Sequence, residues 1–79
     1  MIAGVAIENW KLPIFKRHLD AAGFTYTEHP GVTLDTLLLQ VKVEPLQRLL
    51  ELQALLRVAL AEARANPPTG ANIHDRRNN

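Results

Sequence analysis

The sequence predicts an α+β domain of five elements in the order strand, helix, strand, strand, helix. The expected architecture is a three-stranded mixed sheet with two helices on one face and a disordered C-terminal tail. Three observations predict this class. Apolar residues recur with a period of two in some segments and of 3.6 in others, single glycines and prolines separate those segments, and 79 residues without cysteine suffice for one core. We therefore expect one domain over residues 1–66 and a disordered tail over residues 67–79.

The first strand and helix are predicted at residues 2–23. Residues 2–8, IAGVAIE, are short, apolar and partly β-branched, which is typical of a buried strand. Asn9 is expected to cap the helix that follows. Proline is tolerated in a first turn, so Pro13 places the helix start between Trp10 and itself. Gly23 suits the left-handed position that ends a helix.

The second half of the domain is predicted as a hairpin and a long helix. Residues 24–29, FTYTEH, alternate between two faces as a strand does, and Pro30 and Gly31 predict a turn in which Gly31 takes a positive φ. Residues 36–44 form the clearest strand. Residues 45–65 predict a helix of about five turns. The inward face of the last strand is expected to comprise Leu37, Leu39, Val41 and Val43.

The connections between these segments predict the mixed sheet. A right-handed crossover through the first helix places the first two strands in parallel. The short turn after residue 29 makes the last two strands antiparallel. Both helices are expected on one face of the sheet, because both must pack against a single hydrophobic core.

The composition predicts a protein that is not an enzyme. The chain contains no serine and no cysteine, and its four glycines are too scattered to form a phosphate-binding loop. His18, His29 and His74 have no metal-ligand spacing. We therefore expect no catalytic residue, no cofactor and no metal. The N-terminal segment lacks the basic start of a signal peptide, and no apolar run approaches a membrane span, so we expect a cytoplasmic protein.

An excess of apolar surface predicts association with a protein. Three strands and one short helix are too small to cover every leucine of the 45–65 segment, and small residues line the far face of the sheet. We expect a homodimer or a complex with a partner protein. The residues expected at that partner or dimer interface are Leu38, Leu46, Leu50, Leu52 and Leu55.

A small basic cluster offers an alternative type of site. Lys11, Lys16 and Arg17 follow Trp10, and Lys42 lies on the last strand, so phosphates of a nucleotide or of a nucleic acid are possible ligands. The net charge of +1 favours protein contact over nucleic-acid binding, because nucleic-acid-binding domains usually carry a clear basic surplus.

Residues 7–43, IENWKLPIFKRHLDAAGFTYTEHPGVTLDTLLLQVKV, resemble a group of small, uncharacterised accessory proteins of temperate bacteriophages. The W-K-L-P helix start, the A-A-G stop and the H-P-G turn occur there in the same order. The resemblance implies a viral protein that acts in the bacterial host cytoplasm, where such proteins commonly disable host enzymes or defence systems by direct binding. It supplies no binding or catalytic residue.

These observations together predict a non-catalytic phage accessory protein that inhibits a host defence or enzyme complex by direct contact. An anti-CRISPR-like inhibitor is the most specific form of this hypothesis. The alternatives are a sponge for a signalling nucleotide that counters host immunity, or a small nucleic-acid-binding protein.

Overall fold

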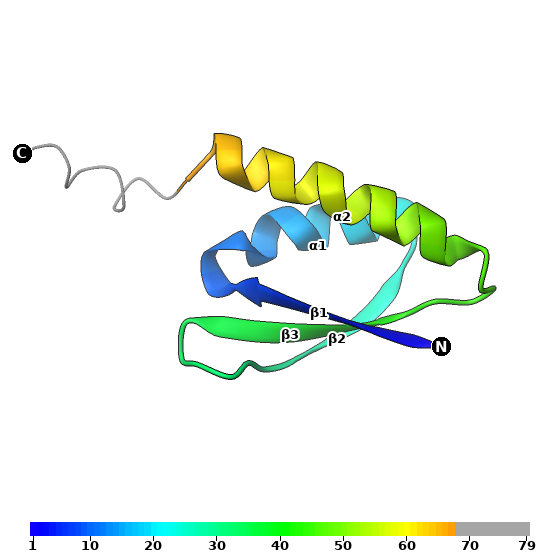
Figure 1. Ribbon diagram of the computed structural model, residues 1–79, viewed down its shortest axis with the longest axis horizontal. Helices are drawn as coiled ribbons and strands as arrows, with labels where there is room; N and C mark the ends of the chain where they lie inside the picture. Colours follow the sequence, from blue (N-terminus) through cyan, green and yellow to red (C-terminus); the bar gives the residue numbers. More distant parts are fainter. Residues whose placement is uncertain (68–79) are drawn as a thin grey trace, which may run out of the picture.

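The computed structural model describes residues 1–67, which contain the five expected elements in the expected order (Figure 1). The predicted α+β class is therefore confirmed. The predicted tail lies, from residue 68 on, outside the described residues. The elements are β1 (Ile2–Glu8), the short 3-10 helix η1 (Asn9–Lys11), α1 (Leu12–Ala22), β2 (Thr25–Pro30), β3 (Thr36–Lys42) and α2 (Arg48–Ala65).

The sheet has the strand order β1-β3-β2, and both neighbouring pairs are antiparallel. Val5 of β1 and Glu28 of β2 both lie opposite Leu39 of β3. β1 and β2 run in the same direction, as the crossover predicts, but β3 lies between them. The expectation of a mixed sheet is therefore wrong. The most apolar strand takes the centre, where its neighbours protect its backbone and both helices cover its side chains.

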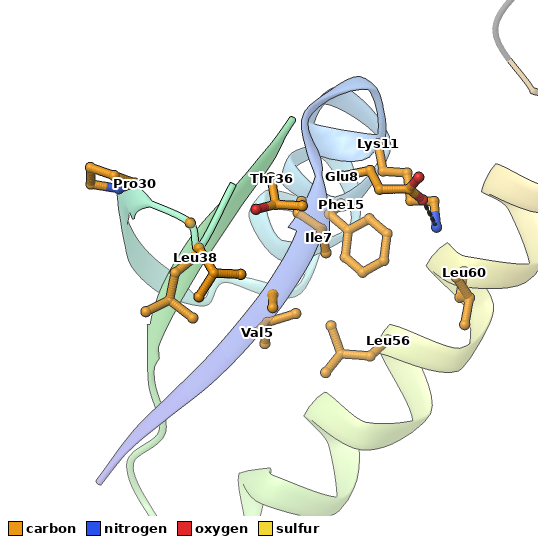
Figure 2. A pocket seen from close by; sticks show the side chains of 13 residues that line it. Val5, Ile7, Glu8, Lys11, Phe15, Pro30, Thr36, Leu38, Leu56 and Leu60 are labelled. Carbon is orange, nitrogen blue, oxygen red and sulfur yellow. Dashed lines mark ion pairs between the residues drawn. The ribbon is translucent and has the colours of Figure 1, made fainter. Parts of the chain in front are cut away.

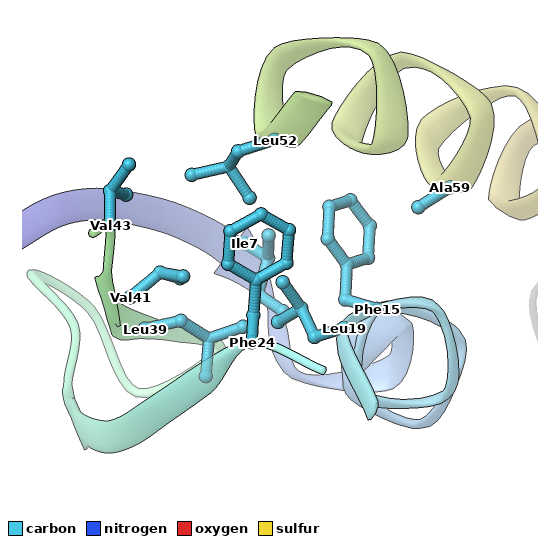
Figure 3. Close-up of a cluster of buried hydrophobic side chains, with 9 residues drawn as sticks. All are labelled: Ile7, Phe15, Leu19, Phe24, Leu39, Val41, Val43, Leu52 and Ala59. Atoms are coloured by element: carbon cyan, nitrogen blue, oxygen red, sulfur yellow. The ribbon is translucent and has the colours of Figure 1, made fainter. Parts of the chain in front are cut away.

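Both helices cover the same face of the sheet, as predicted, and run antiparallel to each other (Figure 1). Figure 3 shows the core between the two layers, where Phe15 and Leu19 of α1 meet Leu52 of α2 above the strands. Leu19 and Leu39 are fully buried. The inward face predicted for β3 is confirmed at Leu39, Val41 and Val43, and Leu37 is half-buried at its end.

The end of α1 confirms the role predicted for Gly23, whose φ is 79°. The Phe24 amide donates to the Leu19 carbonyl at 3.0 Å, and the Gly23 amide donates to the Asp20 carbonyl at 3.1 Å. This pair of bonds defines a Schellman motif, which satisfies the last carbonyls of the helix. It also turns Phe24 into the core, where only 4% of its surface is exposed.

Two local predictions are wrong. Asn9 does not cap α1: its side-chain amide donates to the Leu34 carbonyl at 2.9 Å, and its backbone amide donates to the Asp35 carbonyl at 2.8 Å. Gly31 does not adopt the predicted positive φ; among the described residues, Gly23 is the only glycine that does. Gly31 is needed for space instead, since a Cβ there would lie 2.6 Å from the backbone of Thr36. Both residues thus serve the loop that joins β2 to β3.

Candidate protein-binding surfaces

Three apolar regions of the described residues are candidate binding surfaces. The first is the loop between β2 and β3, where Val32 is 98% exposed and Leu34 is 97% exposed. We call these two side chains the apolar tip. The second comprises Leu50 and Val58 on the outer face of α2 and Leu46 in the turn before this helix, all of which are exposed to solvent. The third is a groove that follows β1.

The loop that carries the apolar tip is held by hydrogen bonds on both sides. At its base, the Gly31 amide donates to the Thr36 carbonyl at 3.2 Å. The Thr33 amide donates to the Thr36 hydroxyl at 3.1 Å, and that hydroxyl also lies 3.2 Å from the Thr33 carbonyl. The two bonds from Asn9 attach the far side of the loop to the end of β1. The loop therefore presents Val32 and Leu34 to solvent in a fixed backbone arrangement.

The groove beside β1, which we call the β1 groove, has a volume of about 540 Å³. Its main walls are apolar: Leu56 and Leu60 of α2 face Val5 and Ile7 of β1, with Phe15 between them (Figure 2). On the other side of β1, the lining continues over Leu38 and Pro30. One end of the groove is closed by an ion pair between Lys11 and Glu8 at 2.8 Å.

The backbone of β1 has an open edge beside this groove. Met1 and Val43 exchange both backbone hydrogen bonds, at 3.0 and 2.8 Å. Antiparallel strands alternate between such pairs and pairs that make no bond to each other. Asn9 and Asp35 continue the same alternation at the other end. Every second residue of β1 therefore directs its N–H and C=O away from β3. These residues are Ile2, Gly4, Ala6 and Glu8.

The two edges of the sheet differ in their protection. β2 is tied to α1 by a hydrogen bond from the Tyr26 hydroxyl to Asp20 at 2.8 Å and by an ion pair between Lys16 and Glu28 at 3.3 Å. β2 also ends in Pro30. Charges and proline are the usual devices that keep an edge strand from pairing. β1 has neither between residues 2 and 7, and within residues 1–67 only β3 pairs with it.

The predicted interface leucines differ in how exposed they are. Leu46 is 64% exposed and Leu50 is 74% exposed, so both are available for association. Leu38 is half-buried on the far face of the sheet, opposite Ala6. Leu52 is only 1% exposed and belongs to the core, so the expectation that it lies at an interface is wrong. Leu55 is half-buried and packs against the core.

The predicted basic cluster does not form one electropositive site. Lys11 pairs with Glu8 and lies 5.4 Å from the centre of the Trp10 ring. Lys16 pairs with Glu28, Arg17 pairs with Glu62, and Lys42 lies 3.9 Å from Glu44. Each of these four cations therefore has a carboxylate beside it. Binding of a nucleotide or a nucleic acid stays a prediction that this geometry does not favour.

Glu62 links the two helices through polar contacts. Its carboxylate accepts a hydrogen bond from Arg17 and lies 2.8 Å from Nε2 of His18. The contact with His18, followed by that with Arg17, lowers the pKa of Glu62 below its ordinary value. His18 is half-buried and has a structural partner, so these contacts explain its place without a ligand.

Tyr26 has a raised pKa of about 12. Desolvation is the largest cause, followed by the hydrogen bond to Asp20 and the negative charges of Asp20 and Glu28, all of which oppose the tyrosinate. This hydroxyl therefore fastens β2 to α1 in its neutral form. Among residues 1–67, no group of three or more His, Cys, Asp or Glu side chains could hold a metal ion.

Sequence reasoning did not identify the apolar tip or the open edge of β1. The signal for the tip was present, because GVTLD places two large apolar residues inside a turn. No local pattern indicated the open edge, because the position of a strand at the edge or the centre of a sheet depends on which strands lie beside it.

No family model, curated protein or solved structure matches this chain. Neither of the two long helices in residues 1–67 combines the length and the apolarity that crossing a membrane requires.

Proposed function

We propose that this protein acts without catalysis, by direct contact with another protein, and that the apolar tip is the contact surface. The observation that carries the proposal is the nearly complete exposure of Val32 and Leu34 on a hydrogen-bonded loop. Their side chains contribute almost nothing to the core of the chain that bears them. Binding residues are concentrated on loops that a rigid scaffold positions.

The gain from covering this tip is large enough to support specific binding. Complete burial of a valine or leucine side chain yields about 1.5–3 kcal/mol. Two such side chains held in place would contribute several kcal/mol, because little conformational freedom of the loop remains to be lost on binding. A compact apolar centre surrounded by polar groups is the usual energetic centre of a protein interface. Here Thr33 lies between the two apolar residues and Asp35 follows them.

The biological setting of the proposal comes from the resemblance of residues 7–43 to phage accessory proteins. In that setting the partner is a host defence or enzyme complex in the bacterial cytoplasm, and binding inhibits it. An anti-CRISPR-like inhibitor is the most specific version.

The test is capture from bacterial lysate by the immobilised protein, followed by quantitative mass spectrometry. The test variant is Val32→Ser with Leu34→Ser. The matched control is Leu46→Ser with Leu50→Ser, which removes apolar area from another exposed surface. All three proteins should give the same circular dichroism spectrum, since exposed substitutions change stability by about 0.5 kcal/mol or less.

We expect a protein captured by the wild type and by the control to be lost from the tip variant. Titration of the purified partner should then show at least a tenfold weaker Kd for the tip variant, which corresponds to about 1.4 kcal/mol. Equal capture by all three proteins would contradict the proposal, as would loss in the control alone.

A further inference from the structure

We propose that the open edge of β1 pairs with β1 of a second copy of this chain, antiparallel and centred on Val5, to form one six-stranded sheet. This inference concerns the backbone edge of β1 and does not depend on the partner proposed for the apolar tip, although Val32 of that tip also lines the β1 groove. It rests on the directions of the backbone groups, the side-chain sequence of β1 and the shape of the β1 groove.

The backbone of β1 is complementary to itself. Ile2, Gly4, Ala6 and Glu8 direct their N–H and C=O groups outward, as the exchanged bonds between Met1 and Val43 require. In a two-fold arrangement centred on Val5, Gly4 lies opposite the second copy's Ala6, and Ile2 lies opposite its Glu8. All four outward residues then find partners. A shift of this register by one pair in either direction leaves one of them without a partner.

The side chains of β1 also fit this register. On the helix side of the sheet, Val5 meets the second copy's Val5, and Ala3 meets its Ile7, so that a small residue lies opposite a large one. On the far side, Gly4 meets the second copy's Ala6, which leaves the middle of the seam free of bulky groups. Glu8 lies opposite the second copy's Ile2, and within its own chain it forms an ion pair with Lys11 at 2.8 Å. The pairing therefore brings no like charges directly opposite each other, which matters because such pairs destabilise a sheet.

The β1 groove gives the second copy a place to bury its apolar side chains. Leu56 and Leu60 of α2 lie across the groove from Val5 and Ile7 (Figure 2). A strand that pairs with β1 at this edge extends the sheet, which forms one wall of the groove, beneath α2. Apolar groups of both copies then meet along the helix side of this groove. The two apolar tips then lie at opposite ends of the joined sheet.

The first experiment measures the mass of the wild-type protein by sedimentation and then uses cysteine cross-linking. The chain has no cysteine, so a single introduced thiol reports one contact. Val5→Cys places two thiols in a directly opposed, non-hydrogen-bonded pair, where the spacing suits a disulfide. The matched controls are Gly4→Cys, which faces a different residue of the second copy, and Leu50→Cys, which is 74% exposed on α2.

We expect twice the monomer mass of 8.8 kDa, and oxidation of the Val5→Cys variant to a disulfide dimer many times faster than that of either control. A monomer at every concentration would overturn the proposal, as would equal rates for all three variants. Faster cross-linking through residue 4 or residue 50 would overturn it too. A monomer that binds a host peptide along β1 counts against the second copy as the occupant.

A second measurement guards against loss of folding in a single variant. Val5→Lys and Val5→Glu each place like charges opposite each other, so each alone should sediment as a folded monomer with a wild-type circular dichroism spectrum. Mixing the two should restore the dimer, because residue 5 faces itself across the two-fold axis. Folded variants that fail to associate on mixing would contradict the register.

Discussion

The substitution Leu52→Ala, compared with Leu50→Ala, tests whether the structure assigns the right face of α2 to the core. The two leucines lie two positions apart on the same helix, but Leu52 is 1% exposed and Leu50 is 74% exposed. The change of leucine to alanine is the same in chemistry and nearly the same in helix propensity. A difference in stability therefore reports burial alone.

The expected magnitudes follow from those exposures. Replacing leucine by alanine removes about three methylene equivalents, or roughly 2.4 kcal/mol of transfer free energy when the side chain is fully buried. The cavity left behind raises the loss for Leu52 to about 2.5–5 kcal/mol. Only about a quarter of the Leu50 surface is covered, so its loss should be about 0.6 kcal/mol or less.

The assay is urea and thermal unfolding followed by far-ultraviolet circular dichroism, at one fixed protein concentration because a dimer adds mass action. A domain of this length has a total stability of roughly 4–12 kcal/mol, so Leu52→Ala removes a large part of it. Its Tm should fall by about 10–40 °C, and that of Leu50→Ala by about 5 °C or less. A difference between the two free energies of unfolding below about 1 kcal/mol would refute the assignment of the core face.

Three further predictions follow from single contacts. The tyrosinate absorbance of Tyr26, the only tyrosine in the chain, should titrate near pH 12 rather than pH 10, and the Asp20→Asn variant should titrate lower. Since the folded pKa is the higher one, the stability from this group is complete below pH 10 and is lost as the pH rises toward 12; a midpoint near 10 would contradict the contact. The lowered pKa of Glu62 contributes stability above pH 4.5 that is lost as the pH falls through the folded value, and an acid titration of unfolding should show a weaker slope for Glu62→Gln. Gly31→Ala should destabilise the domain by about 1–3 kcal/mol in urea unfolding, because its Cβ meets the backbone of β3. Gly4→Ala, whose Cβ would lie 3.5 Å from the nearest side-chain atom, should change stability by less than about 1 kcal/mol, and equal effects would show that space at residue 31 is not limiting.

The candidate binding surfaces could be predicted only in part. In the helix predicted at residues 45–65, helical periodicity places most leucines, Leu52 among them, on one apolar arc. Leu46 and Leu50 fall outside that arc, and both are exposed in the structure. Leu52 lies within that arc, so periodicity alone predicts that it is buried. The large number of leucines suggested, however, that the rest of the domain could not cover the whole arc. Whether it is covered depends on how closely α2 approaches Phe15 and Phe24, which no local pattern specifies.

The charges around the basic cluster could also be predicted only in part. Glu8 and Glu44 are close in sequence to Lys11 and Lys42. Glu28 and Glu62, which pair with Lys16 and Arg17, come from distant segments.

The sequence by itself determined the elements of this protein and most of their boundaries. The period of β3 set its buried face, and Gly23 set the end of α1, because both effects act within a few residues along the chain. The tertiary structure decided that β3 lies at the centre, that β1 is an open edge, and that Asn9 fastens a loop instead of capping a helix. These features depend on contacts between segments many residues apart, where the competition among possible neighbours, rather than the preference of any one segment, selects the arrangement.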